Sequence, residues 1–139
     1  MSKPIFLIGL MGAGKTTLAQ YIAQQDNQII NFVDTDEVIS SNHQSSISDI
    51  FKSKGERYFR NCEHELILNS AFENAVVATG GGLPCYNATI ELLLQKGWVI
   101  YLKVAPTILA ERLWNEKDSR PLLHDCETKQ QLIEKLEMN

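Results

Sequence analysis

Short apolar runs alternate along this chain with segments of helical composition. The apolar runs cover residues 4–8 (PIFLI), 29–33 (IINFV), 75–79 (AVVAT) and 98–104 (WVIYLKV). Continuous runs of this kind suit strands that are buried on both faces of a parallel sheet. The pattern therefore predicts an α/β fold with a parallel sheet, and it places binding sites at the carboxyl ends of the strands.

The segments between these runs carry helix signals. Phe59, Cys62 and Leu66 share one helical face through three- and four-residue spacing. Thr128 and Gln131 have the spacing of a capping box at the start of a last helix. The expected helices run over residues 18–25, 46–72 with a break near Gly55, 88–96, 106–114 and from 128 onward.

Composition narrows the class of protein. At 139 residues, we expect a single domain, 1–139, with its own core. The net charge is −4 and no cluster of Lys or Arg stands out, which favours a small-molecule substrate over nucleic acid. The three cysteines form no C-x-x-C pair, so we expect reduced thiols rather than a zinc site or disulfides. No apolar segment has the length of a membrane span or a signal peptide, so we expect a cytoplasmic protein without a membrane partner.

Residues 9–17 (GLMGAGKTT) contain the full phosphate-loop pattern G-x-x-x-x-G-K-[ST], between a predicted strand and a predicted helix. Glycines in such a loop let backbone N–H groups point at a phosphate, and the helix N-terminus favours negative charge. Lys15 can reach the outer phosphates and the Thr16 hydroxyl can bind Mg²⁺. The alternative is a glycine-rich turn with a solvated lysine. The flanking elements favour binding of a nucleoside triphosphate.

The second predicted strand ends in Asp34-Thr35-Asp36, beside the expected phosphate loop. One carboxylate can hold Mg²⁺, directly or through water. The other can accept a proton from a substrate hydroxyl. If the strand ran through both, Asp34 and Asp36 would point the same way. The alternative is that Asp36 caps a helix that starts at Glu37.

Further candidates lie at the third strand end and on the helices. Gly80, Gly81 and Gly82 follow the third strand and favour close contact with a ligand, the alternative being a plain tight turn. Arg60 can pair with Glu56 on the helix surface or bind a substrate carboxylate, and its spacing leaves these alternatives even. Arg120 lies in a polar stretch where a loop can close over nucleotide phosphates.

Together these segments resemble the shikimate kinase family, over residues 4–139. The resemblance implies a fold of the nucleoside monophosphate kinase type, with a five-stranded parallel sheet in the order 2-3-1-4-5. It implies ATP-dependent phosphorylation of the 3-hydroxyl of shikimate, a step of aromatic amino-acid biosynthesis, by a monomer. The matching motifs are GLMGAGKTT (9–17), FVDTD (32–36), FKSKGERYFRNCE (51–63), ATGGGLP (78–84) and SRPLL (119–123).

For the nucleotide, the resemblance implies that Lys15 and Arg120 are catalytic, with Arg120 in a lid at residues 113–125. It places Arg112 against the adenine, and Thr16 and Asp34 on the Mg²⁺ ion. The residues implied to bind the phosphates are Gly12, Ala13, Gly14, Lys15, Thr16 and Thr17.

For the acceptor, the resemblance implies that Asp36 binds the shikimate hydroxyls and serves as the catalytic base. Arg60 is implied to grip the substrate carboxylate. Gly81 and Gly82 are implied to supply backbone contacts, next to Gly80.

The chain also departs from the family pattern. A further arginine of the last long helix, the fifth strand and the final helix have no counterpart before Asn139. We therefore expect a chain truncated at the C-terminus relative to the family, with apolar surface exposed on the neighbouring elements. This leaves two alternatives to shikimate kinase activity. One is a nucleotide-binding module that does not catalyse, and the other is a different small-metabolite kinase, such as gluconate kinase.

Overall fold

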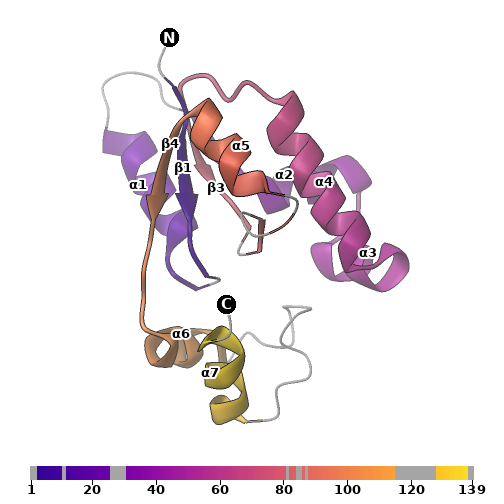
Figure 1. Cartoon of the computed structure of the whole chain (residues 1–139), viewed down its shortest axis with the longest axis vertical. Coiled ribbons are helices and arrows are strands. Elements are labelled where there is room, and N and C mark those ends of the chain that lie inside the picture. The colour runs from indigo at the N-terminus through magenta and orange to yellow at the C-terminus, as the bar shows by residue number, and fades with distance from the viewer. Residues whose placement is uncertain are drawn as a thin grey trace.

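The computed structural model describes residues 3–10, 12–25, 31–80, 82–83, 86, 88–114 and 128–137. Within them a parallel sheet has the order β2-β3-β1-β4 (Figure 1). This confirms the predicted fold class and the first four positions of the implied strand order. The strands are β1 (Ile5–Ile8), β2 (Asn31–Asp34), β3 (Ala75–Ala78) and β4 (Trp98–Tyr101).

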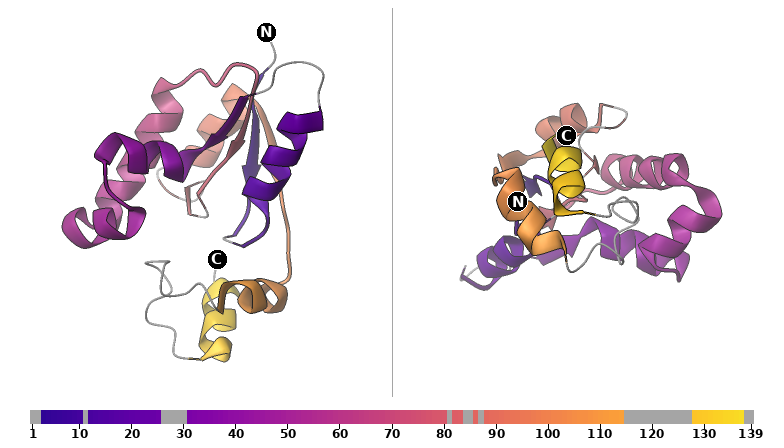
Figure 2. Two further views of the ribbon diagram at one scale, coloured as in Figure 1. Left: turned by 180° about the vertical axis from the view of Figure 1, so that it is seen from behind. Right: turned by 90° about the horizontal axis from the view of Figure 1, so that it is seen from below.

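Helices cover both faces of this sheet (Figures 1 and 2). The predicted break at Gly55 is confirmed: the residue separates two helices and has φ 87°, a value that favours glycine. The predicted capping box is also present, with Gln131 N donating to Thr128 Oγ1 and Thr128 N donating to Gln131 Oε1. The helices are α1 (Lys15–Gln25), α2 (Thr35–His43), α3 (Ile47–Lys54), α4 (Glu56–Asn69), α5 (Thr89–Lys96), α6 (Pro106–Leu113) and α7 (Lys129–Glu137).

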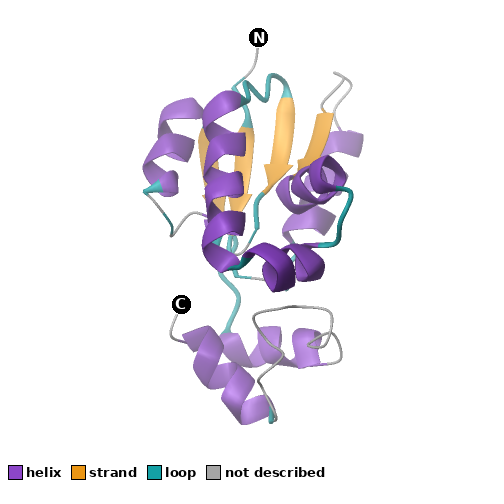
Figure 3. Cartoon of the chain, turned by 90° about the vertical axis from the view of Figure 1, so that its right-hand side faces the viewer, coloured by secondary structure: helices purple, strands orange, loops and turns teal. Residues whose placement is uncertain are grey.

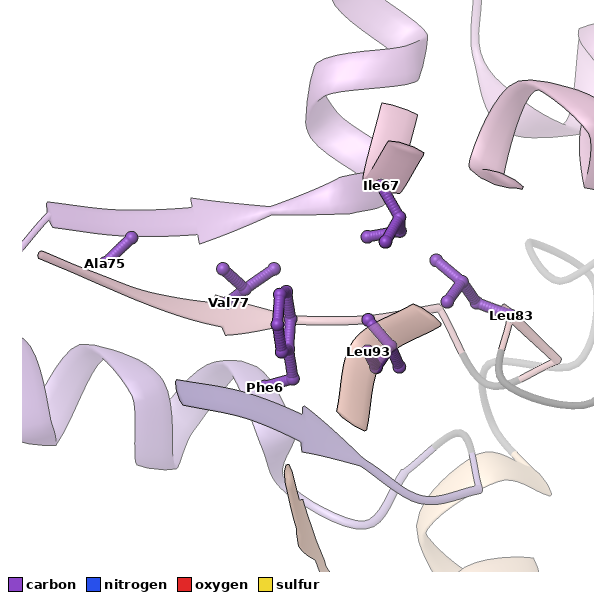
Figure 4. Packing of buried hydrophobic residues seen from close by; sticks show 6 residues of the cluster. All are labelled: Phe6, Ile67, Ala75, Val77, Leu83 and Leu93. Atoms are coloured by element: carbon purple, nitrogen blue, oxygen red, sulfur yellow. The ribbon is translucent and has the colours of Figure 1, made fainter. Parts of the chain in front are cut away.

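The core lies on both faces of the sheet because alternate residues of a strand point to opposite sides. On one face, Val76 of β3 packs with Ala19 of α1. On the other, its neighbour Val77 packs with side chains from α4 and α5 (Figure 4). This double burial explains why the strands appear in the sequence as continuous apolar runs. The cluster drawn in Figure 4 consists of Phe6, Ile67, Ala75, Val77, Leu83 and Leu93.

Two smaller clusters hold the outer helices. Ile39, Ile50 and Phe59 join α2, α3 and α4, and the predicted partners Cys62 and Leu66 pack against them. Leu109, Leu113 and Leu132 belong to a second cluster, which joins α6 to α7. Figure 3 shows these two helices beyond one end of the sheet, the end at which the strands finish. The outer helices therefore frame the carboxyl ends of the strands, where a site is expected.

The edge strand β4 is shorter than predicted, since it ends at Tyr101 rather than near residue 104. Trp98, Ile100 and Tyr101 are exposed there. Apolar surface is thus exposed at this edge, as expected. None of the helices in the described ranges is both long enough and apolar enough to cross a membrane.

The packing predicts a contrast between two neighbouring residues of α4. Ile67 is 0% exposed in the core, so Ile67→Ala should lower the free energy of unfolding by about 2–5 kcal/mol. Leu68 is 51% exposed, so Leu68→Ala should change it by less than about 0.5 kcal/mol. Urea unfolding followed by circular dichroism measures both. Equal effects of the two substitutions would contradict this account of the core.

Candidate active site

The carboxyl ends of β1, β2 and β3 converge on one open cleft of about 820 Å³. This confirms the prediction that the phosphate loop, the acidic pair and the start of the glycine run lie together. Tyr21 of α1 also lines the cleft, although its position in the sequence carries no motif that would have identified it. The lining residues are Gly12, Ala13, Gly14, Lys15, Thr16, Thr17, Leu18, Tyr21, Asp34, Asp36, Ala78, Thr79, Gly80 and Arg112.

The phosphate loop leaves β1 and turns directly into α1. Gly12 and Gly14 have φ values of 83° and 96°, which residues with a side chain rarely adopt. Lys15 is the first residue of α1 and is buried, and its ammonium group donates hydrogen bonds to the carbonyls of Gly9 and Leu10. The lysine is therefore folded back over its own loop and is not the solvated lysine of the alternative hypothesis.

Asp34 connects the phosphate loop to α2. Its Oδ2 accepts a hydrogen bond from Thr16 Oγ1 at 3.2 Å. Its Oδ1 accepts from the backbone N–H groups of Asp36 at 2.9 Å and Glu37 at 3.4 Å, so Asp34 is the N-cap of α2. The hypothesis that Asp36 caps a helix starting at Glu37 is therefore wrong. The strand ends at Asp34, so the assumption of one strand through both aspartates is also wrong.

A charged pair lies behind the acidic residues. Arg60 of α4 is only 6% exposed, and its Nη1 donates to Glu63 Oε1 at 2.7 Å. The pair with Glu56 exists as well, at 3.6 Å from Nε, but the guanidinium itself is buried rather than solvated. The predicted pair with Glu56 is thus confirmed, and binding of a substrate carboxylate by Arg60 stays a prediction. Glu63 is not among the site residues predicted from the sequence. The feature that indicates it is its negative charge, three residues after Arg60 on the same helix.

Glycine is required at two positions where the backbone passes these charged groups. A Cβ on Gly80 would lie 2.6 Å from Glu63 Oε2 and 2.9 Å from Asp36 Oδ1. A Cβ on Gly82 would lie 2.5 Å from Arg60 Nη2. The N–H of Gly80 already donates to Thr35 Oγ1 at 3.0 Å, so this glycine supplies space rather than a donor. The run is therefore more than a plain tight turn.

Burial raises the pKa of Glu63 from 4.5 to about 7. The nearby positive charges of Arg60 and Lys15 act in the opposite direction, while the carboxylate of Asp36 raises the pKa further. Oε2 of Glu63 is buried and has no hydrogen-bond partner among the described residues. Near neutral pH this carboxyl group therefore exists in both protonation states.

The remaining predicted site residues are placed as follows. Arg112 is exposed on α6, and its Nη1 donates to the carbonyl of Gly12 at 2.9 Å, which ties α6 to the phosphate loop. Gly81 and Arg120 lie outside the described residues, as do residues 115–125 of the expected lid.

Comparisons with known proteins identify the family of this chain. The model of the family described as shikimate kinase matches residues 11–139. The chain belongs to the shikimate kinase family. A shikimate kinase from Azobacteroides pseudotrichonymphae is 43% identical over 123 residues, which are 87% of this chain and 71% of that protein.

Solved structures of shikimate kinases have the same fold. The enzyme from Acinetobacter baumannii, in complex with shikimate, superposes with a TM-score of 0.87 at 32% identity. The enzyme from Bacteroides thetaiotaomicron gives a TM-score of 0.86 at 35% identity. Each match covers 98% of this chain, and 74% and 76% of the respective shikimate kinase structures.

The raised pKa of Glu63 predicts a pH dependence of stability. Because the folded state holds this proton up to about pH 7 and the unfolded state only to about 4.5, this group's contribution to stability falls as the pH rises between those values. At about 1.4 kcal/mol per pKa unit, the loss approaches roughly 3 kcal/mol. Glu63→Gln should remove this slope in urea unfolding measured at several pH values.

The matched control is Glu65→Gln, which changes an exposed carboxylate two residues further along α4. It should leave the wild-type slope between pH 4.5 and 7 unchanged. If Glu63→Gln also kept that slope, the assignment of the proton to Glu63 would be wrong.

Proposed function

We propose that this chain transfers the γ-phosphoryl group of ATP to the 3-hydroxyl of shikimate, giving shikimate 3-phosphate and ADP for aromatic amino-acid biosynthesis. The observation that carries the proposal is the buried guanidinium of Arg60, which lies against the backbone at Gly82, two residues after Gly80 of the cleft lining. A fixed guanidinium suits a small substrate with a carboxylate, because its N–H groups can bind both carboxylate oxygens. The relative from Acinetobacter baumannii was solved in complex with shikimate.

On the nucleotide side, the backbone of residues 12–17 and Lys15 would hold the phosphates. The ammonium group of Lys15 now bonds to carbonyls of its own loop, and an incoming phosphate can take over these contacts. Arg112 lines the same cleft and would contact the adenine. Arg120, in the proposed lid at residues 113–125, would neutralise charge on the phosphates.

Thr16 and Asp34 fit a magnesium ion. They offer a hydroxyl and a carboxylate 3.2 Å apart beside the phosphate loop, which are oxygen ligands of the kind Mg²⁺ prefers. No group of three or more His, Cys, Asp or Glu side chains in the described part of the chain forms a metal site. Few protein ligands are expected here, because Mg²⁺ in kinases keeps several waters and binds the phosphates. When bound, it would neutralise charge on the transferred phosphoryl group.

On the acceptor side, Asp36 would act as the base. Asp34 caps α2, and the carboxylate of Asp36 lies beside Gly80, where a substrate hydroxyl can approach it. As the hydroxyl oxygen bonds to the γ-phosphorus, its proton passes to Asp36. The bond between that phosphorus and the bridging oxygen breaks, and its electrons remain on ADP.

Glu63 would position Arg60 for this step. Glu63 Oε1 accepts a hydrogen bond from Arg60 Nη1 at 2.7 Å, while Arg60 Nη2 faces the backbone at Gly82. The guanidinium is thereby kept in one orientation before substrate arrives, which lowers the entropic cost of binding. We also propose that the protein acts as a monomer. Free Cys62 suits the reducing cytoplasm, where we propose that the protein acts.

Arg60→Met should test the acceptor assignment. Losing a buried charged contact to a carboxylate costs about 2–5 kcal/mol, so kcat/KM for shikimate should fall by roughly 30-fold or more. The KM for ATP should change little, because Arg60 is not among the residues that line the cleft beside the phosphate loop. A coupled assay of ADP formation with both substrates varied measures these constants.

The control for this variant is Arg57→Met, which removes an exposed arginine three residues earlier on α4. Its constants should match those of the wild type. ATP binding without shikimate-dependent turnover, or equal turnover with gluconate, would contradict the proposed function itself.

Asp36→Asn should separate proton transfer from binding. A positioned base contributes roughly 100-fold to 10,000-fold to the rate, so kcat should fall within that range. ATP affinity measured by calorimetry should stay within about threefold, because Thr16 and Asp34 remain in place. A kcat near that of the wild type would exclude Asp36 as the base.

A further inference from the structure

We propose that His64 is a positioning residue for the acceptor side of the cleft, acting through the start of α5. This inference rests on the proposed function, because its kinetic consequence concerns the binding of shikimate. His64 lies on α4, and its half-buried imidazole contacts Thr89 at the start of α5. Neither the cleft nor the ion pairs described above include it.

The contact that carries the proposal joins His64 to Thr89, the first residue of α5. His64 Nδ1 lies 2.9 Å from Thr89 Oγ1. The hydroxyl donates its one proton to the carbonyl of Tyr86 at 2.5 Å, so it must accept from His64. The imidazole therefore carries a proton on Nδ1. Thr89 is only 1% exposed. If His64 were lost, the Thr89 hydroxyl oxygen would therefore no longer accept this hydrogen bond, and water could not easily replace it.

The same face of α4 holds both ends of the segment after β3. Arg60 and His64 are four residues apart, so their side chains lie on one side of the helix. Arg60 meets the backbone at Gly82, and His64 meets Thr89. Through Arg60 and His64, α4 therefore contacts both Gly82 and the first residue of α5, and these two contacts fix the positions of Gly82 and Thr89 relative to each other.

The contact between His64 and Thr89 lies next to a strained backbone residue, Ala88. Ala88 directly precedes α5 and has φ 56°, although it is not a glycine, and its side chain cannot cap the helix. The left-handed region costs such a residue about 1–2 kcal/mol, and it persists only where neighbouring contacts hold it. The bonds of Thr89 to His64 and to Tyr86 are the described side-chain contacts next to this residue. Without His64, Thr89 loses the bond beside Ala88, and we expect Gly82 to be held less firmly against Arg60.

A second contact between the same two helices offers a matched comparison. Lys96, at the other end of α5, donates hydrogen bonds to the carbonyls of Leu68 at 3.0 Å and Ser70 at 2.8 Å. It also ties α5 to the end of α4, but it is remote in sequence from Gly82 and Arg60. If joining the helices were the whole effect, the loss of either contact would have the same kinetic consequence.

The experiment compares His64→Leu, His64→Asn and Lys96→Met in the full chain. His64→Leu should raise the KM for shikimate roughly 3- to 10-fold, as expected for one lost hydrogen bond, and change the KM for ATP less than twofold. His64→Asn should restore most of the loss, because its amide nitrogen can take the place of Nδ1 as donor. Lys96→Met should lower the melting temperature without raising the KM for shikimate.

Amide hydrogen exchange of the ligand-free protein provides a readout that does not depend on activity. In His64→Leu, the backbone amides of residues 80, 82, 83 and 89 should exchange faster than in Lys96→Met. Equal KM values for shikimate in the two variants, or unchanged exchange at these amides, would overturn the role of His64. A wild-type protein without shikimate-dependent turnover would instead refute the proposed function, and the exchange data would still decide whether His64 holds the segment.

Discussion

Arg60 and Glu63 meet at 2.7 Å in a place where both side chains are almost completely buried, and the proposed acceptor side of the site depends on that pair. Removing two charges from water is costly, and their attraction offsets that cost only with good geometry and further hydrogen bonds. Here the raised pKa of Glu63 shows that the offset is incomplete. A buried pair of this kind adds little to stability, and in the proposed function its role would be to fix the orientation of the guanidinium for a substrate carboxylate.

The buried charged pair also explains why glycine is found at positions 80 and 82. The chain after β3 must pass between Asp36, Glu63 and Arg60, and a Cβ at Gly80 or Gly82 would collide with these groups. On the proposed acceptor side, the charged side chains of Asp36, Glu63 and Arg60 therefore pack directly against glycine backbone. The proposed nucleotide side instead combines backbone N–H groups of the phosphate loop with side chains such as Lys15, Thr16 and Arg112. Shape and charge would select the substrate on the proposed acceptor side, whereas a phosphate loop binds phosphate by a general mechanism.

This difference decides how much could be predicted from the sequence. The phosphate loop is a contiguous pattern, and parallel strands bring their ends to one edge, so Lys15, Thr16 and Asp34 could be assigned to a common cleft. The exact end of β2 could not be predicted, and the local backbone made Asp34 rather than Asp36 the helix cap. The contact of His64 with Thr89 spans 25 residues of sequence. No local pattern predicts such a contact, because it depends on how α4 and α5 pack on the sheet.

In the proposed function, the charge balance of the acceptor side would favour a carboxyl group whose pKa burial raises to about 7. Asp36, Glu63 and an incoming carboxylate would place three negative charges around one guanidinium, and like charges at such distances repel each other strongly in a site of low dielectric. A proton on Glu63 removes one of these charges without removing the side chain that orients Arg60. A substrate carboxylate on Arg60 would weaken the guanidinium's pull on Glu63 and favour this protonated form. By thermodynamic linkage, substrate binding and protonation of Glu63 then support each other, so the ion pair that positions the guanidinium also adjusts to the charge of the substrate.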